Sequence, residues 1–173
     1  MAEPHKGRPW LVPIGALRRR SGSIRDVEVT APIADMAVSY SRVPDDALVT
    51  FRGTVASTIG GVVVAGKVSA PVEIECRRCL DTALAELDIE VKEVCTDDPD
   101  PDLMYPVEPD WLDLEPLVHD ACILELPLAP LCREDCKGLC PECGVNRNSE
   151  TCSCLVPTDP NGSAGVLGGG GEL

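Results

Sequence analysis

Ten cysteines in a chain of 173 residues limit its possible folds more than any other feature, and six of them lie between Leu126 and Leu155. Those six follow the pattern C-x3-C-x3-C-x2-C-x8-C-x-C, which offers more thiolates than one tetrahedral metal site can use. A further pair, Cys76 and Cys79, forms the C-x-x-C motif CRRC. Eight cysteines therefore fall into four pairs, which is enough for two sites of four thiolates each.

These four pairs can be combined in more than one way. We expect one local site that closes a small C-terminal lobe on itself, made of Cys140, Cys143, Cys152 and Cys154. The second expected site would clamp a hairpin to the segment after a helix, and it consists of Cys76, Cys79, Cys132 and Cys136. The competing arrangement is a single zinc ion held by four of the six C-terminal cysteines, with CRRC free.

The expected cofactor is zinc in a structural role. No secretory signal is visible, because two prolines interrupt PWLVPIGAL, the only apolar run near the start. No run approaches the ~20 apolar residues of a membrane span. We therefore expect a cytoplasmic protein, whose thiols stay reduced and bind metal. Four thiolates leave no open position on the ion, so such a site holds the fold and does no catalysis.

Alternating apolar and polar residues predict β-structure from residue 24 to residue 94. In TALAELDIEVKEV the apolar residues occupy odd positions from Ala83 to Val91, with charged residues between them, which puts each set on its own face of a strand. The same alternation passes through ALVTFRGTV and through VVVAGKVSAPVEIEC, where Pro71 indicates an edge position or a bulge. Gly60-Gly61 separates these two runs and is a hairpin signal.

Two weaker strand patterns precede these runs, at residues 26–33 and 36–43. The segment 97–112 is acidic and rich in proline, which is typical of a solvated loop. An amphipathic helix is predicted at 114–125, with Asp113 as the N-cap and Pro127 as the stop. Its expected apolar face, which would pack on the sheet, consists of Leu114, Leu117, Val118, Ala121, Cys122 and Leu124.

These elements predict an α+β fold: an antiparallel β-sheet or partial barrel of about five strands, packed by one helix, with a C-terminal cysteine-rich zinc-knuckle lobe. The expected divisions are a basic N-terminal arm at 1–23, a β-rich body at 24–131, the cysteine-rich zinc lobe at 132–155 and a disordered tail at 156–173. Of the two leftover cysteines, Cys95 and Cys122, the second falls on the helix, where a buried thiol behaves as a small hydrophobe.

Charge is distributed unevenly along the chain. Residues 1–25 hold six basic side chains and only Glu3 as an acid, whereas the whole chain carries a net charge of −14. The arm could contact RNA phosphates through Arg18, Arg19 and Arg20, dock on the acidic segment 97–115 of the same chain, or stay a solvated tail. The acidic remainder repels phosphate at long range and suits a basic partner.

Catalytic motifs are absent from the sequence. There is no phosphate-binding loop, no nucleophile elbow and no EF-hand spacing, and the only histidines, His5 and His119, lack ligand spacing. CRRC could be a redox dithiol, because its two arginines would lower a thiol pKa. A thioredoxin-type motif opens a helix, however, whereas CRRC joins two predicted antiparallel strands. The sequence therefore favours a protein that is not an enzyme.

The order of these parts resembles the YceD family, also called DUF177. The resemblance covers residues from about 15 to 154 and rests on VEIECRRCL, the acidic loop, DLEPLVHDACILELPLAPLC and CKGLCPECGVNRN. Some members lack the CPxCG lobe yet keep the C-x-x-C and a His or Cys pair after the helix, which supports joining CRRC to Cys132 and Cys136. This chain has Asn146-Arg147-Asn148 where Asn-Leu-Asn is commoner, which adds a positive charge and leaves the ligands intact.

The resemblance implies a role in the accumulation of 23S ribosomal RNA and in assembly of the large ribosomal subunit. We expect a non-enzymatic zinc-binding factor that contacts a large-subunit precursor, through 23S rRNA or a basic ribosomal protein, with no membrane and no small-molecule substrate. One alternative hypothesis is a dithiol redox protein using Cys76 and Cys79. Another is a zinc-ribbon transcription regulator, against which the net charge of −14 argues.

Overall fold

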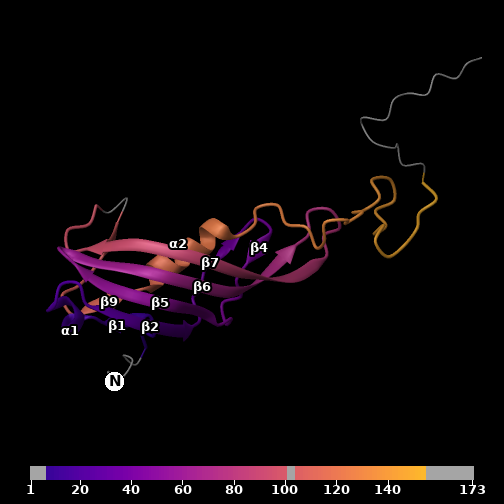
Figure 1. Ribbon diagram of the computed structural model, residues 1–173. Helices are drawn as coiled ribbons and strands as arrows, with labels where there is room; N and C mark the ends of the chain where they lie inside the picture. Colours follow the sequence, from indigo (N-terminus) through magenta and orange to yellow (C-terminus); the bar gives the residue numbers. More distant parts are fainter. Residues whose placement is uncertain (1–6, 101–103, 155–173) are drawn as a thin grey trace, which may run out of the picture.

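The computed structural model describes residues 7–100 and 104–154, and its main element is an antiparallel sheet. Four long strands lie side by side (Figure 1), in the spatial order β2 (Ile24–Ala31), β5 (Val49–Thr58), β6 (Gly61–Glu75) and β7 (Thr82–Thr96). Three short strands extend this sheet to seven: β3 (Ala37–Val38), β4 (Ser41–Arg42) and β8 (Tyr105–Pro106). The expectation of a mostly antiparallel β-fold is confirmed.

Period-two alternation places one face of this sheet in the core. Phe51 and Val68 are fully buried and lie opposite each other, and Ile89 of β7 continues the same row. The residues between them, such as Arg52 and Glu90, are exposed on the other face. The sequence prediction for these strands is therefore confirmed, because a strand half-covered by a core must alternate.

The predicted hairpin and the predicted position of Pro71 are both present. Thr58 pairs with Gly61 across a two-residue turn. Pairing of β6 with β5 ends at Ser69, and pairing with β4 begins at Glu73, so Pro71 has a strand partner only on the β7 side. The register of β6 with β7 is continuous through Pro71. Pro71 thus occupies a local edge, where its missing N–H costs no ladder hydrogen bond.

The helix α2 (Glu115–Glu125) covers the apolar face of the sheet, as expected. The Asp113 carboxylate accepts a hydrogen bond from the Glu115 N–H at 3.1 Å, although Leu114 is the last residue before the helix. The predicted apolar face is wrong at one position, because Leu124 is 83% exposed. Leu124 lies in the last turn at the margin of the buried stripe, and the helix turns by about 100° per residue.

The N-terminal segment differs from the expected arm, because residues from Trp10 onward belong to the fold. Strand β1 (Leu11–Pro13) pairs with β9 (Trp111–Asp113) in a second, two-stranded sheet. The short helix α1 (Gly15–Arg18) follows β1. Four apolar side chains of this segment are buried in the core: Trp10, Val12, Ile14 and Leu17. The alternating apolar side chains of this segment are buried, so the segment is part of the core and not a solvated arm.

The acidic segment 97–112 is likewise not a simple solvated loop in its described residues. It contains β8 and the start of β9, and the side chains of Val107 and Leu112 are buried. In the described residues the main sheet has seven strands where about five were expected, because strands of two residues are too short to show a period-two pattern. The predicted disordered tail at 156–173 lies outside the described residues. In the described part of the chain, no helix has the length and apolar character that crossing a membrane requires.

Candidate metal centres

Two C-x-x-C turns of the chain have the same backbone geometry. In the first, the Leu80 N–H donates to the Cys76 carbonyl at 2.8 Å, and the Cys76 N–H donates to the Asp81 carbonyl at 3.0 Å. In the second turn, which begins at Cys140, the corresponding bonds measure 2.9 and 2.8 Å. The residue after the second cysteine is left-handed in both turns, with φ of 61° at Leu80 and 72° at Gly144. Such turns direct two thiols and several N–H groups toward one point.

Four cysteines from two parts of the chain meet at the tip of the β6–β7 hairpin, and we call them the inner group: Cys76, Cys79, Cys132 and Cys136. Their sulfur atoms all lie within 4.8 Å of one another. The Sγ atoms of Cys76 and Cys136 are 3.7 Å apart, and those of Cys79 and Cys132 are 3.6 Å apart. A tetrahedral ion with metal–sulfur bonds of about 2.3 Å would place its sulfurs roughly 3.8 Å apart. A disulfide would need about 2.05 Å.

The thiols of the inner group do not ionise alike. Burial raises the pKa of Cys76, but the backbone N–H groups of Cys132, Cys79 and Arg78 outweigh it and bring the pKa to about 6. Burial and neighbouring thiols raise the pKa of Cys132. Thiolates held this close repel one another. A cation among the sulfurs would offset this repulsion, because an opposite charge favours the ionised form. The group is therefore chemically suited to a soft divalent metal ion.

The second set of sulfurs, which we call the outer group, lies in the C-terminal lobe and consists of Cys140, Cys143, Cys152 and Cys154. These four sulfur atoms also lie within 4.8 Å of one another. The backbone N–H groups of Cys143 and Glu142 lower the pKa of Cys140 to about 7, against the effect of burial. Cys140 is buried whereas Cys143 is exposed, so this group is open to solvent on one side. The structure thus brings together the two sets that the spacing predicted.

Two asparagines hold the two groups against each other, and sequence reasoning missed them. Asn148 Nδ2 lies 3.4 Å from the Cys136 sulfur, and Asn148 Oδ1 accepts a hydrogen bond from the Lys137 N–H at 2.8 Å. Asn146 Nδ2 donates to the Asp81 carboxylate at 2.8 Å, across to the hairpin. The sequence does contain a signal for these two asparagines, because Asn-x-Asn follows CPECG closely. Only the fold shows that the Asn148 amide meets the Cys136 sulfur.

The hairpin tip and the segment after α2 are joined by backbone bonds as well. The Arg77 N–H donates to the Pro130 carbonyl at 3.1 Å, and the Leu139 N–H donates to the Arg78 carbonyl at 2.9 Å. Gly138 makes the second contact possible: its φ is 70°, and a Cβ there would lie 2.9 Å from the Arg78 carbonyl oxygen. The inner group therefore sits inside a clamp that ties the sheet to the C-terminal lobe.

Replacing Asn148 with alanine should weaken metal binding by the inner group. Burial raises the pKa of Cys136, but the Asn148 amide helps to bring it below its usual value. Partners of ligating atoms typically account for about 10–100-fold in metal affinity, and we expect a loss of that size in a Co²⁺ titration followed by the sulfur-to-metal absorption band. Ser149→Ala is the matched control, since that exposed hydroxyl donates to the Asn146 carbonyl and, within the described residues, contacts no cysteine sulfur. Equal affinity in both variants would contradict the role of Asn148.

The remaining thiols and the helix histidine lie apart from the two groups. Cys95 and Cys122 are buried in the apolar core, and burial raises the pKa of each thiol to about 11. They therefore stay protonated and pack as small hydrophobes, as expected for Cys122. His119 is partly exposed on α2, with Nδ1 3.1 Å from the Asp120 carboxylate. His5 lies outside the described residues.

The three consecutive arginines have different surroundings. Arg18 Nη2 lies 2.7 and 2.5 Å from the two carboxylate oxygens of Asp97, and Arg18 Nη1 donates to the Glu108 carbonyl. Arg19 and Arg20 are exposed. Arg8 likewise pairs with Asp113, at 2.6 Å. The segment is thus docked on the acidic stretch of the same chain, one of the three arrangements that the sequence allowed, and Arg18 is occupied there.

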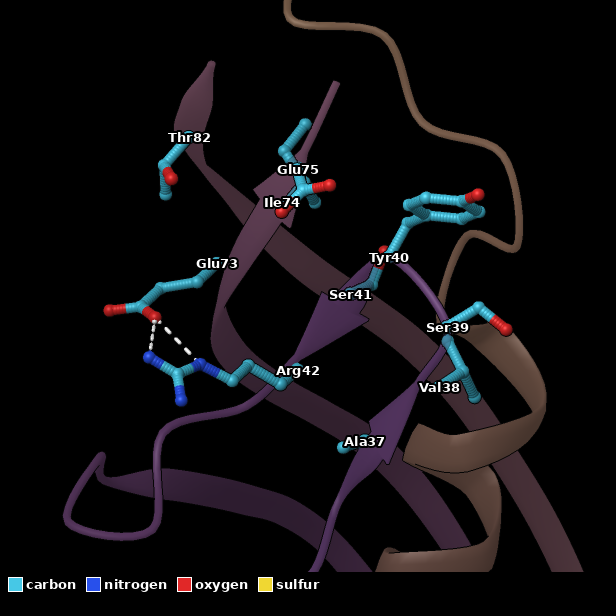
Figure 2. A pocket seen from close by; sticks show the side chains of 10 residues that line it. All are labelled: Ala37, Val38, Ser39, Tyr40, Ser41, Arg42, Glu73, Ile74, Glu75 and Thr82. Atoms are coloured by element: carbon cyan, nitrogen blue, oxygen red, sulfur yellow. Dashed lines mark hydrogen bonds and ion pairs between the residues drawn. The ribbon is translucent and has the colours of Figure 1, made fainter. Parts of the chain in front are cut away.

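A shallow pocket beside the hairpin tip is lined by residues 37–42 together with Glu73, Ile74, Glu75 and Thr82 (Figure 2). Arg42 and Glu73 of this lining neutralise each other, because Arg42 binds the Glu73 carboxylate through two nitrogens at 2.5 and 2.8 Å, which leaves Glu75 as the remaining charge. Figure 2 shows Tyr40 pointing away from this ion pair. The pocket has no pairing of nucleophile and base among these side chains, and the cysteine groups remain the best-defined chemistry of the described residues.

The sequence matches the family described as large ribosomal RNA subunit accumulation protein YceD over residues 64–163, a span that includes both cysteine groups. An uncharacterized protein of Mycobacterium tuberculosis is 35% identical over 157 residues, which cover 86% of this chain and 76% of that protein. An uncharacterized protein of Mycobacterium leprae is 33% identical over 153 residues, covering 82% of this chain and 69% of the relative.

A plant protein is similar over a shorter stretch. It is the large ribosomal RNA subunit accumulation protein YCED homolog 1, chloroplastic, of Arabidopsis thaliana, and it is 35% identical over 52 residues. That stretch covers 30% of this chain and 16% of the plant protein. No solved structure matches the chain significantly.

Proposed function

The chain belongs to the YceD family, and from this membership we propose that it is a non-enzymatic zinc-binding factor that supports accumulation of 23S ribosomal RNA and assembly of the large ribosomal subunit. The observation that carries the proposal is the family match itself, which spans both cysteine groups. The family's own description names large-subunit RNA accumulation. A cytoplasmic location is part of the proposal, since thiols stay reduced there.

Zinc is the metal that we propose for both groups. Four sulfur donors in two C-x-x-C-containing sets favour zinc, which prefers tetrahedral thiolate sites. Every donor in each group is a cysteine, which leaves no coordination position for water or substrate. In this proposal the metal ions fix the hairpin, the segment after α2 and the C-terminal lobe, and they take no part in a reaction.

The geometry gives less support to the two alternative functions. A redox dithiol needs an accessible pair, but Cys76 and Cys79 are 0% and 3% exposed and lie among two further thiols. A transcription regulator needs a basic surface for DNA, and the chain carries a net charge of −14. The partner that best fits such a charge is a basic ribosomal protein, since opposite charges speed and orient association.

Depletion of the chain from its host should lower the ratio of 23S to 16S ribosomal RNA. It should also reduce the large-subunit peak in a sucrose gradient, while the small subunit is maintained. A tagged chain should sediment with large-subunit precursors. An unchanged ratio of the two RNAs after depletion would contradict the proposed function.

The same gradients test whether the N-terminal segment contacts RNA. Arg19 and Arg20 are the exposed members of the arginine run, whereas Arg18 is paired with Asp97. If the segment binds rRNA phosphates, Arg19→Ala with Arg20→Ala should weaken co-sedimentation, because each lost phosphate contact reduces electrostatic affinity. Arg42→Ala is the control, since it also removes an exposed, positively charged residue but lies in β4. If the Arg19 and Arg20 variant co-sediments with large-subunit precursors as well as the Arg42 variant does, the contact with RNA lies on another surface.

A further inference from the structure

The outer edge of β7 is long and without a strand partner over most of its length. β7 pairs with β6 along all of Thr82–Thr96, and among the described residues the only strand on its other side is β8, which meets just Cys95 and Thr96. Within residues 7–100 and 104–154, no further strand or backbone hydrogen bond occupies the outer side between Thr82 and Val94. Figure 1 shows β7 at the margin of the sheet. An edge of this kind is a template for an added strand.

The hydrogen-bonding groups on this edge can be assigned to particular residues. The Thr96 carbonyl accepts a bond from the Val107 N–H at 3.0 Å, outside the β6–β7 ladder. The Asp97 N–H instead donates to the Gly60 carbonyl, toward the β5–β6 hairpin. Backbone groups alternate in direction along an antiparallel strand, so even-numbered residues face outward. The outward N–H and C=O groups therefore belong to Leu84, Glu86, Asp88, Glu90 and Lys92, together with the N–H of Val94, whose carbonyl is used by the pairing with β8.

Of the usual protections of an edge strand, β7 has only its charged side chains. Its sequence, TALAELDIEVKEVCT, contains neither proline nor glycine, and its register with β6 has no bulge. The even-numbered side chains stand on the exposed sheet face, and three in succession are acidic: Glu86, Asp88 and Glu90. The odd-numbered neighbours on the other face, Ala85 and Leu87, are apolar. The edge thus offers acidic groups on one face and apolar groups on the other.

We propose that the outer edge of β7 binds an extended basic segment of a protein partner by strand addition, with basic residues beside Glu86, Asp88 and Glu90 and apolar residues beside Ala85 and Leu87. Main-chain hydrogen bonds supply the affinity in this mode, and alternate side chains supply the specificity. The segment recognised would alternate basic and apolar residues. This inference rests on the proposed function only in taking the partner to be a cationic protein of the large subunit.

Charge complementarity selects this occupant over two others. A second copy pairing through β7 about Asp88 would set Asp88 against Asp88 and Glu86 against Glu90, and like charges directly opposite each other destabilise a sheet. RNA cannot continue the backbone ladder, and the acidic side chains repel its phosphates. A cationic strand satisfies both the open backbone groups and the three carboxylates, of which Glu90 also has an exposed contact with Lys67 of β6 at 3.5 Å.

The first test uses a fluorescein-labelled peptide of about ten residues with alternating lysine and valine, a length that matches a long strand. The full chain in its zinc-loaded form should raise the fluorescence anisotropy of this peptide but not that of an alternating glutamate–valine peptide. Amide hydrogen exchange should then slow at the even residues from Leu84 to Val94. In the free chain these amides should exchange fast, while those of Ala85, Leu87, Ile89 and Val91 stay protected by β6.

Two variants separate strand addition from simple charge attraction. The triple variant Glu86→Lys, Asp88→Lys, Glu90→Lys should weaken peptide binding by about tenfold or more, because three favourable cross-strand pairs become repulsive. The control Asp26→Lys, Asp46→Lys, Glu108→Lys changes the net charge equally at exposed positions elsewhere and should bind as the unmodified chain does. Asp88→Pro removes one outward N–H without touching the β6 ladder, and it should also weaken binding.

Several results would overturn the proposal. One is binding of the lysine–valine peptide without slower amide exchange at the even residues of β7. Another is peptide binding that slows amide exchange at β2 instead. Equal loss in the charge variant and its control would show non-specific attraction, and preferential binding of a labelled ten-nucleotide RNA would show the wrong class of partner. Protection of Ala85 and Leu87 in each free variant verifies that the sheet is intact. Peptide binding with an unchanged 23S to 16S ratio after depletion would uphold this inference while refuting the proposed function.

Discussion

Replacing Cys76 with serine should lower the zinc content from about two ions per chain to about one and should release the hairpin tip from the C-terminal lobe. A serine hydroxyl is a poor substitute for a thiolate ligand at neutral pH. Structural zinc sites contribute on the order of 10–16 kcal/mol of apparent binding free energy, which exceeds the usual cost of truncating even a large buried side chain. Elemental analysis of protein purified without chelator measures the zinc content directly.

Hydrogen exchange should locate the damage caused by Cys76→Ser. The Arg77 and Leu139 amides donate to the Pro130 and Arg78 carbonyls across the clamp, and both should exchange much faster in the variant. Amides at the other end of the sheet, such as that of Val55, should stay protected. Changes confined to the hairpin residues 76–81 would contradict a site shared with Cys132 and Cys136.

Two cysteine variants serve as matched controls. Cys152→Ser removes a ligand of the outer group, so it should also lose about one zinc ion while the Arg77 amide stays protected. Cys122→Ala removes a buried thiol that belongs to neither group and should retain both ions. A zinc content near one ion per unmodified chain would support the single-site arrangement. The absence of zinc from that chain would refute the zinc hypothesis.

Trp10→Ala should destabilise the whole body by about 3–5 kcal/mol, the usual cost of truncating a large buried aromatic side chain. Trp10 is 1% exposed, and its indole N–H donates to the Pro32 carbonyl at 3.3 Å. Its own carbonyl accepts the Leu114 N–H at 3.0 Å, immediately before α2. Urea unfolding followed by circular dichroism measures the loss.

Arg8→Ala is the control for Trp10→Ala, because it changes the same segment at an exposed ion pair with Asp113. Exposed pairs contribute only about 0–1 kcal/mol, so the Arg8 variant should unfold close to the unmodified chain. Equal stability of the two variants would mean that the N-terminal segment is a dispensable arm, contrary to its place in the core.

Local patterns in the sequence were sufficient for the long strands, the helix and the four cysteine pairs, but they left open which pair joins which. Phe51, Val68 and Ile89 are buried because a half-covered strand must alternate, and this period is written in the chain itself. Likewise, C-x-x-C at a turn directs two sulfurs to one point whatever the rest of the fold does. Such features depend on neighbours a few residues apart, which is why reading them needs no tertiary information.

Contacts between distant segments required the folded chain. The apolar stretch from Trp10 to Leu17 falls within the predicted basic arm because basic residues flank it on both sides, yet the partner strand of β1 is β9, about a hundred residues away at Trp111–Asp113. The amide of Asn148 meets the Cys136 sulfur only because the lobe folds back on the hairpin, and Arg18 meets Asp97 for a similar reason. The open edge of β7 is equally invisible in sequence, since a strand's pattern shows which face is covered but not which neighbours it pairs with.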